Sequence, residues 1–191
     1  MTGNGNGSAG TLFHRALAVI GDRVTASVDR LPSQTIDEAV ALLVKARATF
    51  VYGAGRSGII GRAFAMRLVQ AGLTAFVIGE SVTPIVRKGD AVFILSGRGE
   101  SHSSIQAANI VRREGAELIV VTAKPSSKLA HVATILLPLE FTEDAEQREL
   151  APLGTLFESG SLRLCDALVA EIMRRRGETE ESMRRRHAIM V

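Results

Sequence analysis

The chain has 191 residues, of which 46% are hydrophobic and 23% are charged, and its formal net charge is +3. A chain of this length buries one substantial core and hardly two, so we expect one domain. No apolar run approaches the roughly 20 residues of a membrane-spanning helix, and the N-terminus lacks the basic-then-apolar order of a secretory signal, so we expect a cytoplasmic protein without a membrane partner. One Tyr, no Trp and a modest charge argue against a nucleic acid partner.

The N-terminal part changes character after its first ten residues. Residues 1–10 consist mainly of Gly, Asn and Ser, so we predict a disordered tail there and place the single domain at residues 11–191. Residues 12–44 carry apolar side chains at helical spacing, with a break at residues 31–33. Two leading helices are therefore expected, the second of them capped by Ser33.

The middle of the chain alternates short apolar runs with helical stretches. The runs are rich in β-branched or aromatic residues and cover residues 49–52, 74–78, 91–95, 118–122 and 134–137. The helical stretches between them cover residues 57–71, 103–114 and 127–133. Strands that are apolar throughout are typical of a parallel sheet covered on both faces. We therefore predict a doubly wound α/β fold with a five-stranded parallel sheet flanked by helices.

The C-terminal part is predicted to be helical after a polar loop that follows Glu140. A long helix is expected over residues 154–176, ending at Gly177, and a short helix over residues 180–187. Cys165, the one cysteine, lies in an apolar run of the long helix. A single cysteine excludes an internal disulfide framework and a metal site made of cysteines alone, and we expect Cys165 to pack in the core.

A glycine-rich loop, GAGRSG at residues 53–58, follows the first predicted strand and opens a helix. With Glu80 at the end of the second strand, it fits the dinucleotide-binding pattern. A second alternative is that the glycines serve only the tight packing of strand against helix. We prefer a third interpretation, in which Arg56 and Ser57 bind a small anion, because we expect no second domain to hold a substrate beside a nicotinamide and because a similar loop follows the third strand.

That second loop, SGRGES at residues 96–101, leads directly into a helix. Glycines let backbone N–H groups converge on an anion, serines add hydroxyl donors, and a helix N-terminus contributes the positive end of its dipole. The alternative is that Ser101 and the serines after it merely cap the helix. Because capping does not require two glycines and a hydroxyl before the turn, the pattern predicts a site for one phosphate monoester.

These motifs resemble those of the sugar isomerase (SIS) domain and, within it, the 6-phospho-3-hexuloisomerase family. A strand ending in S-G-x-G-E-S/T is the phosphosugar signature of that domain, and GAGRSG before the FAMRL helix of residues 64–68 is similar to the hexuloisomerase branch. Thr83-Pro84, the segment APLGTLFE at residues 151–158 and Arg186-His187 follow in the family's order, so that the likeness covers about residues 12–190. The chain departs from the pattern at Arg98, where a small residue is usual, while Ser101 keeps the hydroxyl of the usual threonine.

The resemblance implies the SIS fold and an isomerase that interconverts D-arabino-3-hexulose 6-phosphate and fructose 6-phosphate through an enediolate, in the ribulose monophosphate pathway of formaldehyde assimilation. It implies that Glu158 is the catalytic base and that His187, often lent by a neighbouring subunit in similar enzymes, assists proton transfer. Arg56 would either polarise the carbonyl or grip the phosphate. The implied phosphate-binding set comprises Gly55, Ser57, Ser96, Gly97, Gly99, Glu100 and Ser101.

Several alternatives stand beside this interpretation. An acidic residue such as Glu158 is also what a helix N-terminus favours, and a histidine such as His187 also suits a basic surface helix. Another SIS sugar-phosphate isomerase, of the arabinose 5-phosphate type, fits the phosphate loop as well, and a non-catalytic phosphosugar sensor is a different class of explanation. The implied chemistry requires neither a metal nor a redox cofactor, and the implied protein partner is a second copy of the chain, in a dimer or a homotetramer.

Overall fold

The computed structural model describes the backbone of residues 6–189 and the side chains of residues 10–189. The two predicted leading helices are present as α1 (Asn6–Val28) and α2 (Ser33–Lys45). The predicted tail needs a correction: residues 1–5 lie outside the described residues, but residues 6–10 form the first turns of α1, because extending a nucleated helix adds a hydrogen bond for each residue that is ordered. Ser33 is the first residue of α2 and not its cap, since Pro32 holds the N-cap position.

Five parallel strands form one sheet in the order β2-β1-β3-β4-β5, which confirms the predicted fold class. The strands are β1 (Thr49–Gly53), β2 (Ala75–Val77), β3 (Ala91–Leu95), β4 (Glu117–Thr122) and β5 (Ile135–Pro138). From β1 the chain first builds outward to β2 and then crosses back to β3 on the other side of β1. The carboxyl ends of β1 and β3 therefore form the switch point at which open α/β sheets bind their ligands.

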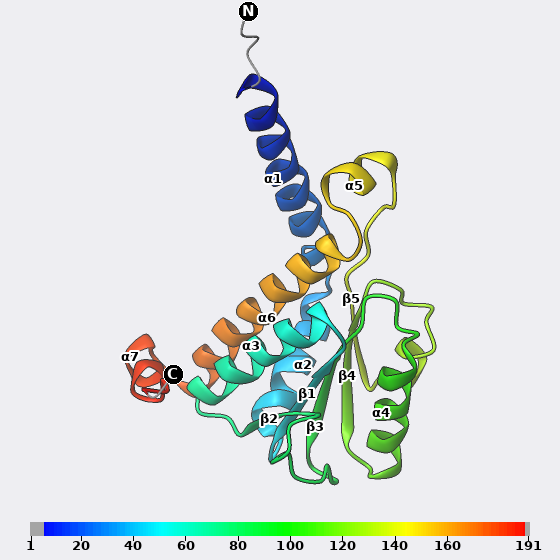
Figure 1. Ribbon diagram of the computed structural model, residues 1–191. Coiled ribbons are helices and arrows are strands. Elements are labelled where there is room, and N and C mark those ends of the chain that lie inside the picture. Colours follow the sequence, from blue (N-terminus) through cyan, green and yellow to red (C-terminus); the bar gives the residue numbers. More distant parts are fainter. Residues whose placement is uncertain (1–5, 190–191) are drawn as a thin grey trace, which may run out of the picture.

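The two faces of the sheet are covered by different helices, and alternate strand residues point to each face. Val51, Phe93 and Val121 belong to the core cluster that also holds buried residues of α2, α3 (Arg56–Gln70) and α6 (Thr155–Arg176). Phe50 and Val120 belong to the cluster under α4 (His102–Arg113) and the short 3₁₀ helix η1 (Ala130–Val132). Figure 1 shows this arrangement, with α3 and α6 on one side of the sheet and α4 on the other. Of the helix predicted over residues 127–133, only η1 is formed.

Cys165 is 1% exposed within the larger core cluster, as predicted. Burial raises the pKa of its thiol well above the ordinary value, since the thiolate would lose its hydration. Cys165 is therefore a packing residue, and its sulfur is chemically inert under ordinary conditions.

The acidic stretch after β5 contains a short helix where the sequence predicted only a loop. This helix, α5 (Ala145–Leu150), begins at Asp144, whose side chain accepts a hydrogen bond of 2.8 Å from the backbone N–H of Gln147. Leu150 is buried, and Ala151, directly after the helix, packs in an apolar cluster with Val24 of α1, so α5 is stabilised by its cap and by an apolar contact that the local sequence does not reveal. In Figure 1, α5 lies beside α1, beyond the carboxyl ends of the strands.

A charged contact fixes α5 to α1. Arg23 of α1 donates hydrogen bonds to Asp144 Oδ1 at 3.1 Å and to Glu146 Oε2 at 2.9 Å, and its side chain is only 22% exposed. The hydrogen bond from Arg23 and the cap bond from Gln147 both hold the pKa of Asp144 below its usual range. The position of α5 is thus set by its contact with α1 and by the small apolar cluster beneath it.

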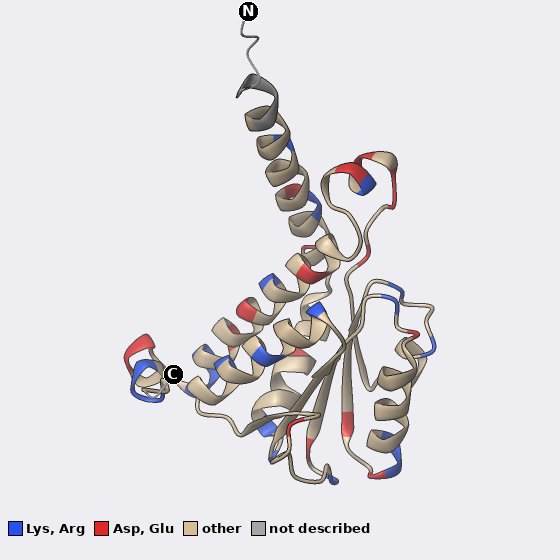
Figure 2. Cartoon of the chain, in the orientation of Figure 1, with Lys and Arg blue, Asp and Glu red and all other residues tan. Residues whose placement is uncertain are grey.

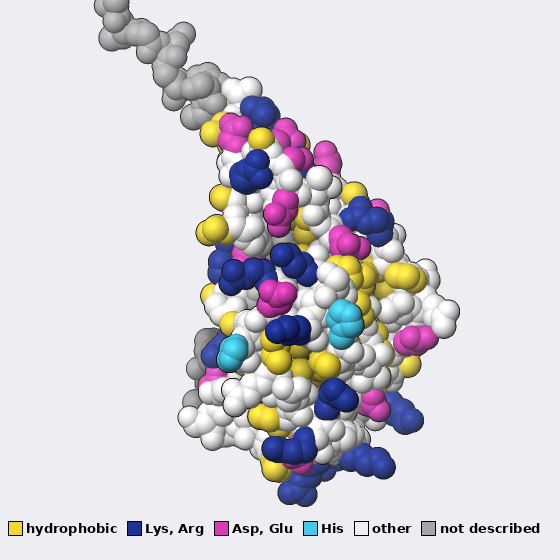
Figure 3. Space-filling model, turned by 90° about the vertical axis from the view of Figure 1, so that its right-hand side faces the viewer, with side chains coloured by type: hydrophobic (Ala, Val, Ile, Leu, Met, Phe, Trp, Pro, Cys, Tyr) yellow, Lys and Arg dark blue, Asp and Glu magenta, His cyan; other side chains and the backbone are white. Residues whose placement is uncertain are grey.

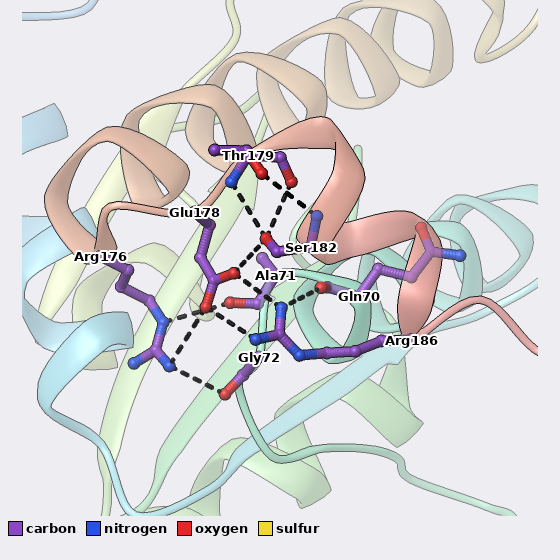
Figure 4. A network of polar contacts seen from close by, with 8 residues as sticks. All are labelled: Gln70, Ala71, Gly72, Arg176, Glu178, Thr179, Ser182 and Arg186. Carbon is purple, nitrogen blue, oxygen red and sulfur yellow. Dashed lines mark hydrogen bonds and ion pairs between the residues drawn. The ribbon is translucent and has the colours of Figure 1, made fainter.

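The C-terminal helix α7 (Glu180–Arg185) packs at the far end of α6, against the end of α3. Figure 4 shows the polar network that holds it: Arg186 donates to both carboxylate oxygens of Glu178 at 2.8 and 3.0 Å and also to the carbonyl of Gln70. Ser182 donates to the same carboxylate. These hydrogen bonds, that from Arg186 first, lower the pKa of Glu178 to about 2.

Apart from Glu117 at the start of β4, charged residues lie on helices and loops, and the middle of the sheet is uncharged (Figure 2). The face seen in Figure 3 carries basic and acidic side chains close to one another over most of its height. Among residues 6–189, no helix is long and apolar enough to cross a membrane.

Candidate functional site

A cavity of about 550 Å³ opens at the carboxyl ends of the strands, where the N-termini of α3, α4 and α6 meet. Its walls come from five parts of the chain: the two glycine-rich loops, the end of β4, the α5 segment and the start of α6. The lining residues are Ala54, Ser57, Leu95, Ser96, Gly97, Arg98, Ser101, Ala123, Lys124, Phe141, Glu143, Gln147, Leu153, Gly154, Leu156, Phe157 and Glu158.

The loop after β3 is held in one conformation by its neighbours. Gly97 O accepts hydrogen bonds from the backbone N–H of Ala123 at 3.0 Å and from Thr122 Oγ1 at 3.2 Å. Gly99 has a φ of +63°, and a Cβ at this position would lie 2.0 Å from Ser127 Oγ, so only glycine fits. The backbone and hydroxyls of this loop are therefore arranged before any ligand arrives.

Ser101 stands at the N-cap position of α4, yet its hydroxyl is used differently from a cap. It donates to Ser104 Oγ at 2.6 Å, and within the described residues it accepts no capping bond from the helix backbone. The capping alternative for Ser101 is thus contradicted. Ser101 and the 8% exposed Ser96 both line the cavity in front of the first turn of α4, whose backbone N–H groups have no intrahelical partners.

The glycines of the first glycine-rich loop have two roles: some allow close packing, and one shapes the turn before Arg56 and Ser57. A Cβ on Gly58 would lie 2.5 Å from Gly53 O, so these two glycines let α3 approach β1 closely, as the packing alternative proposed. Gly55 has φ +58° and ψ −133°, a conformation closed to L residues, and a Cβ there would meet no atom within 4 Å. This turn leads directly to Arg56 and Ser57 at the start of α3, and Ser57 lines the cavity.

Glu158 lies in the first turns of α6 with its carboxylate in the cavity. Its side chain is 14% exposed, and Oε2 lies 2.9 Å from Arg56 Nε. The directions of these groups do not form a hydrogen bond, and Oε2, although buried, accepts none from any described residue. Glu158 is therefore a carboxylate that is paired by charge but keeps an unused acceptor at the wall of the cavity.

Two exposed cations stand at the phosphate loop, and an acidic segment lies opposite. Arg98 and Lys124 line the cavity beside Ser96, whereas Glu143 and Gln147 line it from the α5 segment. The sequence marked Arg98 as a departure from the family pattern, but it did not identify Lys124, Glu143 or Gln147 as cavity residues. No local pattern marks them, because they reach the cavity only through the fold.

The other predicted site residues do not line the cavity, although Gly55, Arg56, Gly99 and Glu100 lie in the two glycine-rich loops beside it. His187 is exposed beyond α7, at the opposite end of α6 from Glu158, and α6 alone is about 33 Å long. Glu100 is exposed and Glu80 is ion-paired with Arg62, and neither is among the described residues that line the cavity. In the described part of the chain, no three His, Cys, Asp or Glu side chains come together as metal ligands.

The fold and the loop geometry agree with a known family. The model of the SIS domain matches residues 42–156, which is more than half of the chain, and the protein belongs to this family. This match covers all five strands and both glycine-rich loops.

Individual relatives narrow the comparison. An uncharacterised protein of Archaeoglobus fulgidus is 38% identical over 92% of this chain and 98% of its own length. The 3-hexulose-6-phosphate isomerase of Methylomonas aminofaciens is 35% identical over 80% of this chain and 85% of its own. A crystal structure from Methanococcus jannaschii, from which the function of a 3-hexulose-6-phosphate isomerase has been inferred, is 28% identical, covers 92% of this chain and 98% of its own, and superposes with a TM-score of 0.83.

Proposed function

We propose that this protein is a phosphosugar isomerase that interconverts 3-hexulose 6-phosphate and fructose 6-phosphate. The observation that carries the proposal is the buried, incompletely hydrogen-bonded carboxylate of Glu158 in the same cavity as the phosphate-type loop after β3. The names of the relatives that are 30–35% identical support the choice of substrate.

The phosphate group binds at the loop after β3 in this proposal. Ser96, Ser101 and Ser57 donate hydroxyl hydrogen bonds, and the start of α4 contributes its unpaired N–H groups. The guanidinium of Arg98 and the ammonium of Lys124 add charge from the rim, where water weakens each interaction. A phosphate anchored in this way holds the sugar chain in one orientation across the cavity.

Glu158 then acts as the base. Its carboxylate removes the proton from C2 of the 3-ketose, the electron pair forms the C2–C3 double bond of the enediolate, and a proton returns to C3 as the carbonyl forms at C2. The hydroxyl proton passes from O2 to O3 in the same sequence. A carboxylate with an unused acceptor is ready to take a proton without first breaking a hydrogen bond.

Arg56 stabilises negative charge both before and after Glu158 takes up the proton. It lies beside Glu158 before the reaction, and when Glu158 is neutralised by the proton, the guanidinium faces the new oxyanion of the enediolate. In this proposal Arg56 takes the first of the two alternatives that the sequence left open, since a cation next to the base serves the reacting end of the sugar and not the phosphate.

We also propose that His187 acts in the site of a neighbouring subunit of a dimer or tetramer. In its own chain it is separated from Glu158 by the length of α6. Exposed apolar side chains along α3 and α6, namely Ile59, Met66, Val69 and Leu162, provide a surface for a second copy of the chain. In such an assembly the C-terminal segment of one subunit would lie at the cavity of its neighbour.

The test is a coupled assay with 3-hexulose 6-phosphate, alongside arabinose 5-phosphate and other ketose phosphates. We expect fructose 6-phosphate to form without added cofactor, and Glu158→Gln to lower kcat at least about 100-fold. Glu117→Gln serves as the matched control and should retain full activity, because Glu117 lies at the amino-terminal end of β4, away from the cavity. Exclusive turnover of arabinose 5-phosphate would reassign the substrate, while full activity of Glu158→Gln would remove the base from this mechanism.

A further inference from the structure

The α5 side of the cavity carries an uncharged polar group that the proposed reaction does not use. Gln147 lines the cavity, and its side-chain amide forms no hydrogen bond with any described residue, although Oε1 is buried. A buried polar atom without a partner is unfavourable in a folded protein, so such an atom in a cavity wall points to a ligand contact.

The wall that presents Gln147 is rigid. Arg23 ties the start of α5 to α1, and Ala151, directly after the last residue of α5, is buried in the apolar cluster with Val24 and Leu156. The backbone of Gln147 itself is held by Asp144 and by Ala151, whose N–H donates to Gln147 O at 2.8 Å. The backbone that carries the amide of Gln147 is therefore held at a fixed place in the cavity wall.

The charged side chains that line the cavity indicate which part of a bound sugar phosphate lies next to Gln147. Arg98 and Lys124 line the side of the cavity formed by the loops after β3 and β4, while Glu143 lines the side formed by the α5 segment, where Asp144 and Glu146 are paired with Arg23. A phosphate is attracted to the first side and repelled by the second. The group that meets Gln147 is consequently the unphosphorylated end of the substrate, and an amide, which both donates and accepts, matches a hydroxyl.

From this arrangement we infer that Gln147 is a specificity-determining residue, which hydrogen-bonds a hydroxyl at the end of the sugar remote from the phosphate. The inference rests on the proposed function for the phosphosugar class, and it adds the means by which chain length is recognised. A short phosphate ester would contact the loop after β3 but not α5, whereas a six-carbon sugar phosphate would contact both.

The experiment measures binding, by calorimetry, of fructose 6-phosphate, glycerol 3-phosphate and inorganic phosphate. We expect Gln147→Ala to weaken the binding of fructose 6-phosphate about fivefold, which is the scale of one neutral hydrogen bond. The affinities for glycerol 3-phosphate and inorganic phosphate should not change. Gln147→Met, which keeps the volume but not the hydrogen bond, should behave like Gln147→Ala. Gln106→Ala, on an exposed face of α4, is the matched control and should bind all ligands normally.

The outcomes separate this inference from the proposed function. Equal weakening of all three ligands in Gln147→Ala, no weakening at all, or recovery in Gln147→Met would overturn the role of the amide while leaving the isomerase proposal intact. Selective loss of fructose 6-phosphate in a protein that shows no isomerase activity would support the role of Gln147 and reject the reaction. Failure of the wild-type protein to bind any of the sugar phosphates would overturn both.

Discussion

Each end of helix α6 carries a glutamate paired with an arginine, and the two pairs are built in opposite ways. At the C-terminal end, Glu178 accepts hydrogen bonds from Arg186 and Ser182 and has a pKa near 2 (Figure 4). At the N-terminal end, Glu158 faces Arg56 without forming a hydrogen bond at Oε2. A carboxylate whose acceptors are all occupied holds helices together, whereas one with a vacant acceptor beside a cavity can take up a proton.

The strongest test of this comparison is Glu158→Asp. The shorter side chain keeps the charge but withdraws the carboxylate by one methylene group, so we expect kcat to fall about 100-fold while the melting temperature changes little. Steady-state kinetics and thermal unfolding measured on the same sample check both parts. A large loss of stability together with unaltered kcat would mean that Glu158 is the structural member of the two pairs.

A smaller effect on catalysis is expected for Arg56→Gln. Removal of the cation leaves Glu158 without its charge partner and the enediolate without a facing positive charge, so we expect kcat to fall about tenfold or more with a modest change in KM. Arg62→Gln, on the same helix and outside the cavity, is the matched control. A change confined to KM would instead assign Arg56 to phosphate binding.

Glu178→Gln should show the reverse pattern. Loss of the ion pair with Arg186 loosens α7 from the end of α3, so we expect the melting temperature to fall by a few degrees while kcat of the folded enzyme is retained. Glu180→Gln removes an exposed pair in the same helix and should have almost no effect on stability. A loss of activity in Glu178→Gln that stability does not explain would show that α7 contributes to a catalytic site.

The smallest effect concerns pH. The folded-state pKa of Glu178 lies near 2, below the value of about 4.3 expected in the unfolded chain, so its stabilising contribution is complete above the unfolded value and is lost as the pH falls toward 2. The difference in unfolding free energy between wild type and Glu178→Gln should therefore be constant from pH 7 to about 5 and shrink below that. Denaturant titrations at several pH values measure it, and a difference that grew on acidification would contradict the pKa shift.

Much of the fold was predictable because its signals are local. The strand runs and the glycine loops follow from apolar patterning and from backbone demands such as the positive φ of Gly99. The cap of α5, Asp144 with Gln147, is local, but the helix was missed because the contacts that fix it, Arg23 with Asp144 and Val24 with Ala151, come from α1, more than a hundred residues earlier in the chain. The beginning of α1 was missed for a related reason, since composition describes a segment by itself and not the helix that it extends.

The features of the site can likewise be separated into those that local sequence predicts and those that depend on tertiary structure. By itself, the sequence determined the parallel sheet, the phosphate-type loop and the candidate residues Arg56 and Ser96, because adjacent residues in a loop or a first helical turn carry their chemistry with them, and the resemblance to the SIS family added Glu158. Only the tertiary structure decided that Glu158 meets Arg56 across two helices, that Gln147 and Lys124 enter the same cavity, and that His187 stands far from it. The physical reason is that these relations depend on helix packing and on chain crossings between distant segments, which no local pattern encodes.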